Sequence, residues 1–274
     1  MTGLTTSIQS AFLADHQAQL FRAGTEQISL VAWRYSSDPD VVAGCKAMLR
    51  PSELRRATRL KAPSACATFV QRRAFIGWLI HQQAQTSAPQ TSASRSPAYP
   101  FPTGGRPPQH FSVTSTASHA LVAIAQSPGI GVDIEAPDDT LDVEDLARGL
   151  FSPGEEKSIA DAAPEQAAPI FYRLWRLKEA GLKYLGLGLS DGINRFQFLP
   201  DGQGDLKVVL SPQRTFCADR PVPRFYECRF SGFDVALALP GQMGSEDPWR
   251  VAKATPWAQD ENGVTTDERR ALAV

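Results

Sequence analysis

Apolar positions recur along the chain with two different spacings, which predict strands and helices. Residues 28–35 are rich in β-branched and aromatic side chains and predict the first strand. Two helices are expected to follow, over residues 52–60 and 67–83. Short apolar runs predict further strands at residues 121–125, 130–135, 196–198, 206–210, 224–230 and 234–239. The first two of these runs flank a Ser-Pro-Gly turn, so we expect them to form a hairpin.

The sequence Ser-Pro-Gly-Glu at residues 152–155 is typical of a helix start. Serine caps the amino end, proline suits the first helical position, and glutamate closes a capping box. A longer helix containing Trp175 is expected to follow. Residues 49–53 resemble residues 150–155, about 100 positions later, and each segment precedes a longer predicted helix. This similarity favours two related halves.

Composition limits the class of protein. With 274 residues, of which 42% are apolar, the chain can form one large domain or two small ones. A net charge of −1 gives no overall field that would attract nucleic acid or a membrane surface. The four cysteines have no metal-binding spacing and are too scattered for a disulfide scaffold. The amino-terminal residues lack a signal-peptide core, and no apolar run approaches about 18 residues. We therefore expect a cytoplasmic protein that binds neither nucleic acid nor membranes.

The distribution of polar residues suggests boundaries along the chain. Residues 85–109 are rich in serine, proline, threonine, alanine and glutamine, which predicts a linker. We expect an amino-terminal extension over residues 1–25 and a first α+β half over residues 26–110 that includes this linker. A second α+β half is expected over residues 111–240, followed by a polar, loosely held tail over residues 241–274.

Two acidic residues lie in an otherwise apolar strand, Gly-Val-Asp-Ile-Glu at residues 131–135. Side chains alternate between the faces of a strand, so Asp133 and Glu135 share one face. Two buried, unpaired carboxylates repel each other and are costly to desolvate, and a bound cation relieves both costs. Oxygen ligands of this kind favour Mg²⁺. Considered alone, two solvated acids at a strand end are the more common interpretation.

The predicted helix around Trp175 carries a second polar set. At 100° per residue, Trp175, Glu179 and Lys183 fall on the side opposite an apolar stripe. A surface salt bridge between Glu179 and Lys183 is the ordinary interpretation of this spacing. The neighbouring tryptophan makes a cleft an equally good interpretation. Lys178, at the edge of the apolar face, is expected to reach the same cleft by its long stem.

Basic residues gather in the first half of the chain. They are Arg55, Arg56, Arg59 and Lys61 around the first predicted helix, Arg72 and Arg73 on the second, and Arg106 in a Gly-Gly-Arg-Pro turn. A solvated helix face is the usual explanation for such a cluster. A ligand with several phosphates would also account for it, because guanidinium groups match phosphate geometry.

Together these segments resemble the 4′-phosphopantetheinyl transferases of the surfactin-synthetase-activating (Sfp) type. The resembling segments are residues 131–135 (family G(I/V)D(I/V)E), 151–156 (FSxxE), 175–183 (WxxKEAxxK), 105–107 (G(K/R)P) and 72–74 (an arginine-containing helix). Order and spacing also match, over about residues 28–240. The two acidic motifs, about 40 residues apart, give the resemblance most of its specificity.

The resemblance implies two similar α+β halves that form an intramolecular pseudo-dimer, and therefore a monomer. It implies transfer of the 4′-phosphopantetheine arm of coenzyme A to a serine hydroxyl of an apo acyl or peptidyl carrier protein. Adenosine 3′,5′-bisphosphate would be the by-product. Carriers of fatty-acid, polyketide and nonribosomal-peptide synthesis all remain open.

Residue by residue, the resemblance assigns Asp133, Glu135 and Glu179 to Mg²⁺, which would bridge the pyrophosphate of coenzyme A. Glu179 would also be the base for the incoming serine, and Lys183 would stabilise the leaving phosphate. The coenzyme A contacts would come from Arg56, Arg59, Lys61, Arg106, Lys178 and Lys183.

One segment departs from the family. Where the family has Ser-His, residues 111–116 read Phe-Ser-Val-Thr-Ser-Thr, with Ser115 at the histidine position. The hydroxyls of Thr114 and Ser115 are expected to donate to a coenzyme A phosphate instead, with less charge. His119 is expected to be an ordinary histidine at the start of a strand.

Two other functions compete with the transferase. A non-catalytic module that binds coenzyme A or carrier proteins would explain the lost histidine, but it would have little use for three carboxylates. A metal-dependent phosphohydrolase would need more clustering of histidine or aspartate than four scattered histidines offer.

Overall fold

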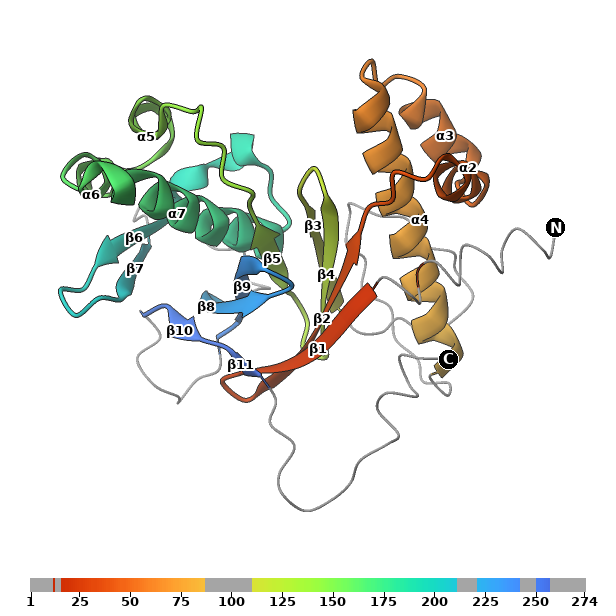
Figure 1. Cartoon of the computed structure of the whole chain (residues 1–274). Helices are drawn as coiled ribbons and strands as arrows, with labels where there is room; N and C mark the ends of the chain where they lie inside the picture. The colour runs from red at the N-terminus through yellow and green to blue at the C-terminus, as the bar shows by residue number, and fades with distance from the viewer. Residues whose placement is uncertain (1–11, 13–15, 87–109, 211–220, 242–249, 257–274) are drawn as a thin grey trace.

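The computed structural model describes residues 12, 16–86, 110–210, 221–241 and 250–256 of the chain. Two β-sheets lie next to each other in the middle of the molecule, and a long helix covers the outer face of each (Figure 1). This mixture of helices and sheets agrees with the α+β class predicted from the sequence.

The first sheet has the strand order β11-β1-β2-β4-β3, and all its pairs are antiparallel. Its strands are β1 (His16–Ala23), β2 (Glu26–Arg34), β3 (His110–Ser115), β4 (His119–Ala125) and β11 (Thr255–Pro256). Between β2 and β3 the chain forms α2 (Pro39–Ala47), α3 (Pro51–Ala57) and α4 (Pro63–Thr86). The short helices α2 and α3 pack against α4, which covers this sheet.

The second sheet has the order β10-β8-β9-β5, and only β10 runs parallel to its neighbour among the described strands. Its strands are β5 (Gly131–Ile134), β8 (Pro223–Phe230), β9 (Phe233–Pro240) and β10 (Ala252–Lys253). The helices of this half are α5 (Val143–Leu150), α6 (Pro153–Ala160) and α7 (Pro164–Leu185). After α7 come the 3₁₀ turns η1 (Leu189–Asp191) and η2 (Ile193–Arg195), then the hairpin of β6 (Phe196–Pro200) and β7 (Leu206–Leu210). The capping box predicted at Ser152 and Glu155 opens α6.

The same order of elements occurs twice along the chain. Each half has a strand, two short helices, a long helix and a β-hairpin: β2, α2, α3, α4 and β3–β4 in the first half, and β5, α5, α6, α7 and β8–β9 in the second. In both sheets the opening strand pairs with the last strand of the hairpin. The weak sequence similarity between residues 49–53 and 150–155 therefore falls at equivalent places, at the start of α3 and of α6.

Side chains alternate between the two faces of each strand, so the interior packs in three layers. One lies between α4 and the first sheet, one between the two sheets, and one between the second sheet and α7. In β2, Leu30 and Ala32 face the second sheet, whereas Val31 and Trp33 face α4. In the second sheet, Val132 and Leu237 face the first sheet, and Ala236 and Ala238 face α7. Both faces of β4 and β5 are therefore buried, which explains why each of these strands is apolar apart from one residue, His119 in β4 and Asp133 in β5.

The boundaries predicted for the first half are wrong at both ends. Residues 16–23 form β1, which pairs along its whole length with β2, so they are not an extension. Residues 110–125 form β3 and β4 and complete the first sheet, so the second half begins after residue 125 and not at residue 111. The linker expected over residues 85–109 lies mostly outside the described residues.

Two further predictions about β-structure are wrong. The runs on either side of the turn at residues 127–129 do not form a hairpin, because β4 pairs with β2 and β3 whereas β5 pairs with β9. Residues 250–256 are not loosely held, because β10 pairs with β8 and β11 pairs with β1. Val251 and Ala254 are buried between these pairs. This segment, residues 250–256, thus joins the edges of both sheets.

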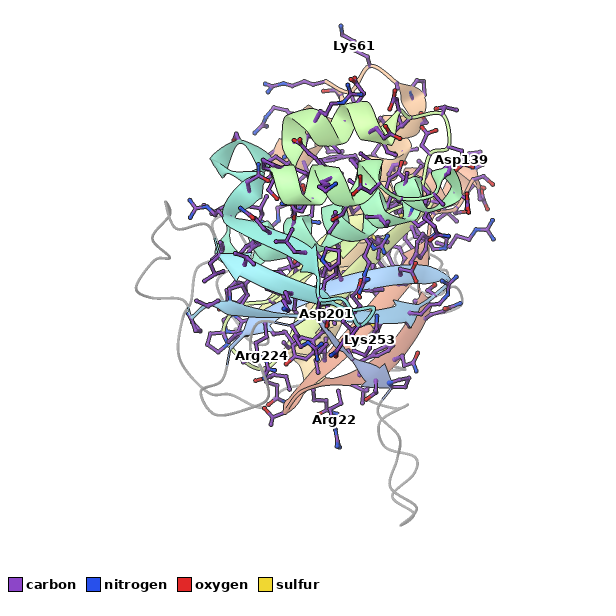
Figure 2. All side chains as sticks on the ribbon, turned by 90° about the vertical axis from the view of Figure 1, so that its left-hand side faces the viewer. Arg22, Lys61, Asp139, Asp201, Arg224 and Lys253 are labelled. Carbon is purple, nitrogen blue, oxygen red and sulfur yellow. The ribbon has the colours of Figure 1, made fainter. Side chains whose placement is uncertain are left out.

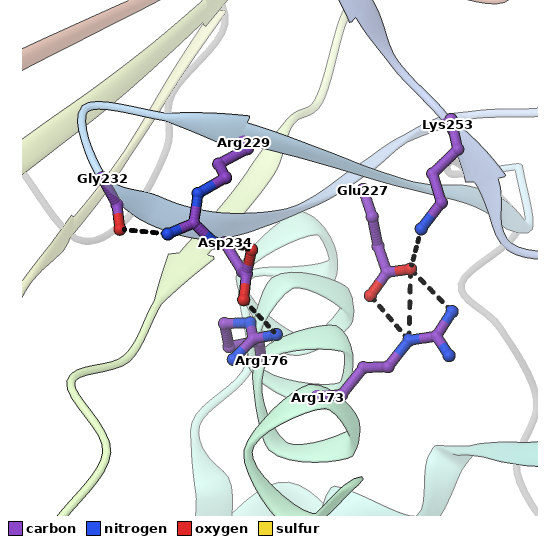
Figure 3. Close-up of polar contacts among 7 residues, drawn as sticks. All are labelled: Arg173, Arg176, Glu227, Arg229, Gly232, Asp234 and Lys253. Atoms are coloured by element: carbon purple, nitrogen blue, oxygen red, sulfur yellow. Dashed lines mark hydrogen bonds and ion pairs between the residues drawn. The ribbon is translucent and has the colours of Figure 1, made fainter. Parts of the chain in front are cut away.

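Ion pairs hold the second sheet against α7 and against β10 (Figure 3). Arg173 of α7 donates to both carboxylate oxygens of Glu227 on β8, at distances of 2.8–3.2 Å. Lys253 of β10 donates to the same carboxylate at 3.0 Å. Burial opposes ionisation of Glu227, but these bonds outweigh it, and the pKa of Glu227 is lowered.

Of the cysteines, Cys45, Cys66 and Cys228 are free, and Cys217 lies outside the described residues. Burial raises the pKa of Cys45 to about 12, so its thiol stays protonated, as the sequence predicts for a reduced cysteine. No helix in the described ranges is both long and apolar enough to cross a membrane.

Gly131 allows β5 and α7 to approach each other closely. A Cβ atom at this position would lie 1.8 Å from the carbonyl oxygen of Ala180 and 2.7 Å from the amide nitrogen of Tyr184. Both neighbours are helix backbone and cannot move without displacing α7. Because Asp133 and Glu135 follow Gly131 on the same face, this contact determines how near they come to α7.

We expect Gly131→Ala to lower the free energy of unfolding by about 3 kcal/mol or more, because the new methyl group must push β5 away from α7. The measurement is chemical denaturation followed by circular dichroism. The control is Gly77→Ala, at an exposed position of α4 with nothing within 4 Å, which should raise stability by up to about 1 kcal/mol. Equal effects of the two substitutions would contradict the close approach.

Candidate active site

A cavity of about 330 Å³ lies where β3, at the edge of the first sheet, meets β5, at the edge of the second. Its lining comes from four elements or their ends: Arg72 of α4, Val113, Thr114 and Ser115 of β3, Asp133, Ile134 and Glu135 at β5, and Trp175, Glu179 and Lys183 of α7. The structure therefore brings together the two acidic motifs that the sequence placed about 40 residues apart.

Asp133 is the most buried acid in the cavity, with 3% of its surface exposed. Its Oδ1 atom accepts from the Thr114 hydroxyl at 2.8 Å and from Lys183 Nζ at 2.6 Å. Its Oδ2 atom is buried and has no partner. The two donors fix the orientation of the carboxylate, and one oxygen is left for another ligand.

Glu135 and Glu179 lie in a field that disfavours their ionisation. Burial, followed by the charge of Asp133, raises the pKa of Glu135 to about 7, although a hydrogen bond from Trp175 and the charge of Lys183 oppose this. Burial also raises the pKa of Glu179, with Lys183 opposing and Asp133 adding to the shift. The carboxylates are thus poised to bind a proton or a cation.

The predicted polar face of α7 is confirmed for Trp175, Glu179 and Lys183, which all line the cavity. Lys183 Nζ also donates to the Val132 carbonyl at 3.2 Å, so the ammonium group is held against β5 as well as against Asp133. The pair of Glu179 and Lys183 is therefore not an isolated surface salt bridge.

The donor set fits a hard divalent cation. Three carboxylates share one cavity, the charge of Asp133 raises the pKa of both Glu135 and Glu179, and one buried oxygen of Asp133 lacks a partner. Oxygen donors of this kind suit Mg²⁺. Within the described ranges, no three histidine, cysteine or carboxylate side chains are already gathered as a metal cluster. The magnesium site therefore stays a prediction that the donor chemistry supports.

Thr114 and Ser115 line the cavity, but their hydroxyl groups already have partners. Thr114 donates its proton to Asp133, so it is not free to donate to a phosphate. Ser115 Oγ accepts from Arg72 Nη1 at 2.7 Å.

Arg72 is a cavity residue that the sequence analysis placed in the basic cluster but did not assign as a coenzyme contact. It lies three positions after Phe69 and four before Ile76, both buried, so a charged residue falls on the apolar face of α4. A charged residue on an otherwise apolar helix face is the sequence signal that could have identified Arg72 as a site residue. Its neighbour Arg73 instead forms an ion pair with Glu53 of α3 and does not line the cavity.

The expectation that Lys178 reaches the cleft is wrong. Lys178 and Glu155 are both fully buried and form an ion pair at 2.9 Å. Lys178 Nζ also donates to the carbonyl oxygen of Phe196 at 2.8 Å and to Asn194 Oδ1 at 3.2 Å. Glu155 accepts in turn from the amide nitrogens of Ser152 and Phe198. Lys178 thus fastens α7 to α6 and β6, and its role is structural.

Three further predicted coenzyme contacts, which the structure describes, do not line the cavity. Arg56, Arg59 and Lys61 are exposed at the end of α3 and after it, and Arg56 lies over the Phe69 ring at 5.6 Å. Figure 2 shows Lys61 projecting outward at one end of the molecule. Arg106 lies outside the described residues. His119 opens β4 as predicted and packs against Phe233 with ring centres 5.0 Å apart.

Comparison with known proteins finds a similarity for the part of the chain that forms one wall of this cavity. The model of the 4′-phosphopantetheinyl transferase superfamily matches residues 129–227. Residues 129–227 are therefore similar to this superfamily. The matched region starts just before β5, ends within β8 and includes α7, so it supplies the acidic wall of the cavity.

Individual relatives point the same way. The putative 4′-phosphopantetheinyl transferase slr0495 of Synechocystis is 26% identical over 66% of this chain and 78% of its own length. The transferase HetI of Nostoc is 36% identical over 37% of this chain and 38% of its own length. The transferase Sfp of Bacillus subtilis is 27% identical over 40% of this chain and 48% of its own length. The matches to HetI and Sfp thus span less than half of either protein.

The buried pair of Glu155 and Lys178 should control the stability of the second half. Lys178→Met leaves Glu155 charged and buried, and we expect it to cost about 3–5 kcal/mol in the free energy of unfolding. The control, Lys157→Met, breaks an exposed pair with Asp161 and should change it by less than about 1 kcal/mol. Urea denaturation of the two variants is the measurement. A Lys178→Met protein as stable as the control would contradict the structural role.

Glu135 should make the stability of the metal-free protein depend on pH. Its pKa is raised from 4.5 to about 7, so the folded chain keeps a proton that the unfolded chain releases. The contribution of Glu135 to stability should therefore fall as the pH rises through this window. We expect the melting temperature of the wild type, measured in a chelator, to fall relative to Glu135→Gln between pH 4.5 and 7.

Glu165→Gln, at an exposed position of α7, is the control and should follow the wild type. Parallel melting profiles for the wild type and Glu135→Gln would show that Glu135 titrates normally.

Proposed function

We propose that the protein is a 4′-phosphopantetheinyl transferase of the Sfp type that acts on coenzyme A and an apo carrier protein. The observation that carries this proposal is the convergence of Asp133, Glu135, Glu179 and Lys183 in one cavity. The match of residues 129–227 to the superfamily supports it. Its substrates and its cytoplasmic location are part of the proposal.

We further infer that the two halves form an intramolecular pseudo-dimer and that the chain is a monomer. The repeated order of elements and the repeated strand pairing support this inference. The cavity has walls from both halves, because α4 and β3 belong to the first and β5 and α7 to the second. A single half would therefore supply only part of the site.

In the proposed reaction, the serine Oγ of the carrier bonds to the phosphorus that bears the pantetheine arm. The P–O bond to the leaving adenosine 3′,5′-bisphosphate breaks. Glu179 accepts the serine proton, and burial suits it to this role by raising its pKa. Lys183 holds Asp133 in place and lies where it can offset negative charge on the departing phosphate.

Asp133, Glu135 and Glu179 are the residues that would hold Mg²⁺. The cation would neutralise phosphate charge as the leaving group departs. Thr114 and Lys183 orient the Asp133 carboxylate through Oδ1, which directs the unpartnered Oδ2 to the ligand.

An intact-mass assay tests the proposal directly. The protein is mixed with coenzyme A, Mg²⁺ and apo carriers from fatty-acid, polyketide and nonribosomal-peptide synthesis. We expect at least one carrier to gain one phosphopantetheine arm, and EDTA to prevent the gain. Glu179→Gln should lower kcat by about 100-fold to 10,000-fold, because the reaction loses its base.

Glu165→Gln is the matched control, since this exposed glutamate lies on the same helix and away from the cavity. It should retain full activity. If the wild type binds coenzyme A and carriers but transfers nothing, the protein is instead a non-catalytic binding module. Hydrolysis of coenzyme A without any carrier would indicate a phosphohydrolase.

A further inference from the structure

Arg72 enters the cavity from the half of the fold that supplies none of the carboxylates. It lies in the middle of α4 and is partly buried. Its Nη1 atom donates to Ser115 Oγ at 2.7 Å, and its Nε atom is buried without a partner. The guanidinium group is thus held at one side by a neutral acceptor and retains donor capacity.

Among the described residues, Arg72 forms no ion pair with a carboxylate, whereas Lys183, the other cation of the cavity, is paired with Asp133. Tyr35 lies close enough to feel the charge of Arg72, but burial outweighs that effect and raises the pKa of Tyr35 to about 12. The phenol therefore stays neutral.

A partly buried arginine without an anionic partner is costly, and arginine is the side chain best suited to bind two oxygens of a phosphate at once. The three carboxylates that line the same cavity would repel such an anion unless cations flank it. Lys183 and Mg²⁺ on one wall and Arg72 on the other would provide flanking charges. A doubly charged pyrophosphate, with oxygens on both phosphorus atoms, matches cationic groups on two walls.

We propose that Arg72 binds the pyrophosphate of coenzyme A and that Ser115 positions its guanidinium group. The inference rests on the proposed transferase function, and it assigns a phosphate contact to the first half of the fold. A serine at position 115 suits this arrangement, because its hydroxyl accepts from the guanidinium, whereas a protonated histidine has no acceptor to offer.

Isothermal titration calorimetry tests the contact without relying on catalysis. Wild type and Arg72→Ala are titrated with coenzyme A, dephospho-coenzyme A and inorganic pyrophosphate, each with Mg²⁺. We expect Arg72→Ala to weaken all three by about ten-fold to a hundred-fold, the loss of one charged hydrogen-bonding group. Arg72→Lys should recover part of the affinity, because it keeps the charge and loses the fork.

Two controls keep the result specific. Arg148→Ala removes an exposed arginine of α5 outside the cavity and should bind all three ligands like the wild type. Arg72→Gln, which keeps a long polar side chain, replaces Arg72→Ala if the alanine variant unfolds.

A double-mutant cycle tests the positioning role of Ser115. Ser115→Ala should raise the Kd for pyrophosphate several-fold in the wild type and have no effect in the Arg72→Ala background. A residue with a merely structural role would weaken binding equally in both backgrounds.

Three outcomes would decide the matter. Unchanged binding by Arg72→Ala overturns the inference, while carrier modification by the wild type would leave the transferase standing. A loss seen with coenzyme A but absent with dephospho-coenzyme A and pyrophosphate also overturns it, because Arg72 would then contact the 3′-phosphate. If Arg72→Ala binds pyrophosphate more weakly than the wild type, but the wild type modifies no carrier, the Arg72 contact is supported and the transferase is overturned.

Discussion

The backbone of β5 lies directly against the backbone of α7, and the candidate site depends on this contact. Only the missing side chain of Gly131 permits it, since a Cβ atom there would fall 1.8 Å from the Ala180 carbonyl oxygen. Gly181 of α7 allows a second close approach, toward β6, because a Cβ atom there would lie 2.6 Å from the Phe196 ring. With helix and strand so close, acidic side chains two and four positions after Gly131 meet those of α7.

The charged residues on and around α7 are paired less completely the closer they lie to the cavity. The fully enclosed pair, Glu155 and Lys178, is complete in itself and satisfies backbone groups at the start of α6 and in β6. Closer to the cavity, Asp133 is satisfied on one oxygen and open on the other. Glu135, at the mouth, has its proton affinity raised by burial and by its neighbours. Charge compensation is thus complete in the core and incomplete where a ligand would bind, as expected for a functional site.

Local sequence was sufficient to predict what depends on period and spacing. The shared face of Asp133 and Glu135, the polar side of α7 and the capping box at Ser152 all follow from neighbours within a few residues. Long-range pairing was not accessible in this way. The turn at residues 127–129 resembles that of a hairpin, yet β4 and β5 belong to different sheets. Lys178 lies one position before Glu179, and only the location of Glu155 shows that it points into the core.

The segment of residues 250–256 protects the outer strand of each sheet. β8 and β1 would otherwise present unpaired N–H and C=O groups on the same side of the molecule, and such edges are templates for pairing between chains. A chain shortened before residue 250 would therefore leave two more residues unpaired on the edge of each sheet, Phe21 and Arg22 on β1 and Tyr226 and Glu227 on β8, and be more prone to aggregate, even with its cavity intact. Affinity tags or fused domains are better attached beyond residue 256, where the pairing of β10 and β11 is preserved.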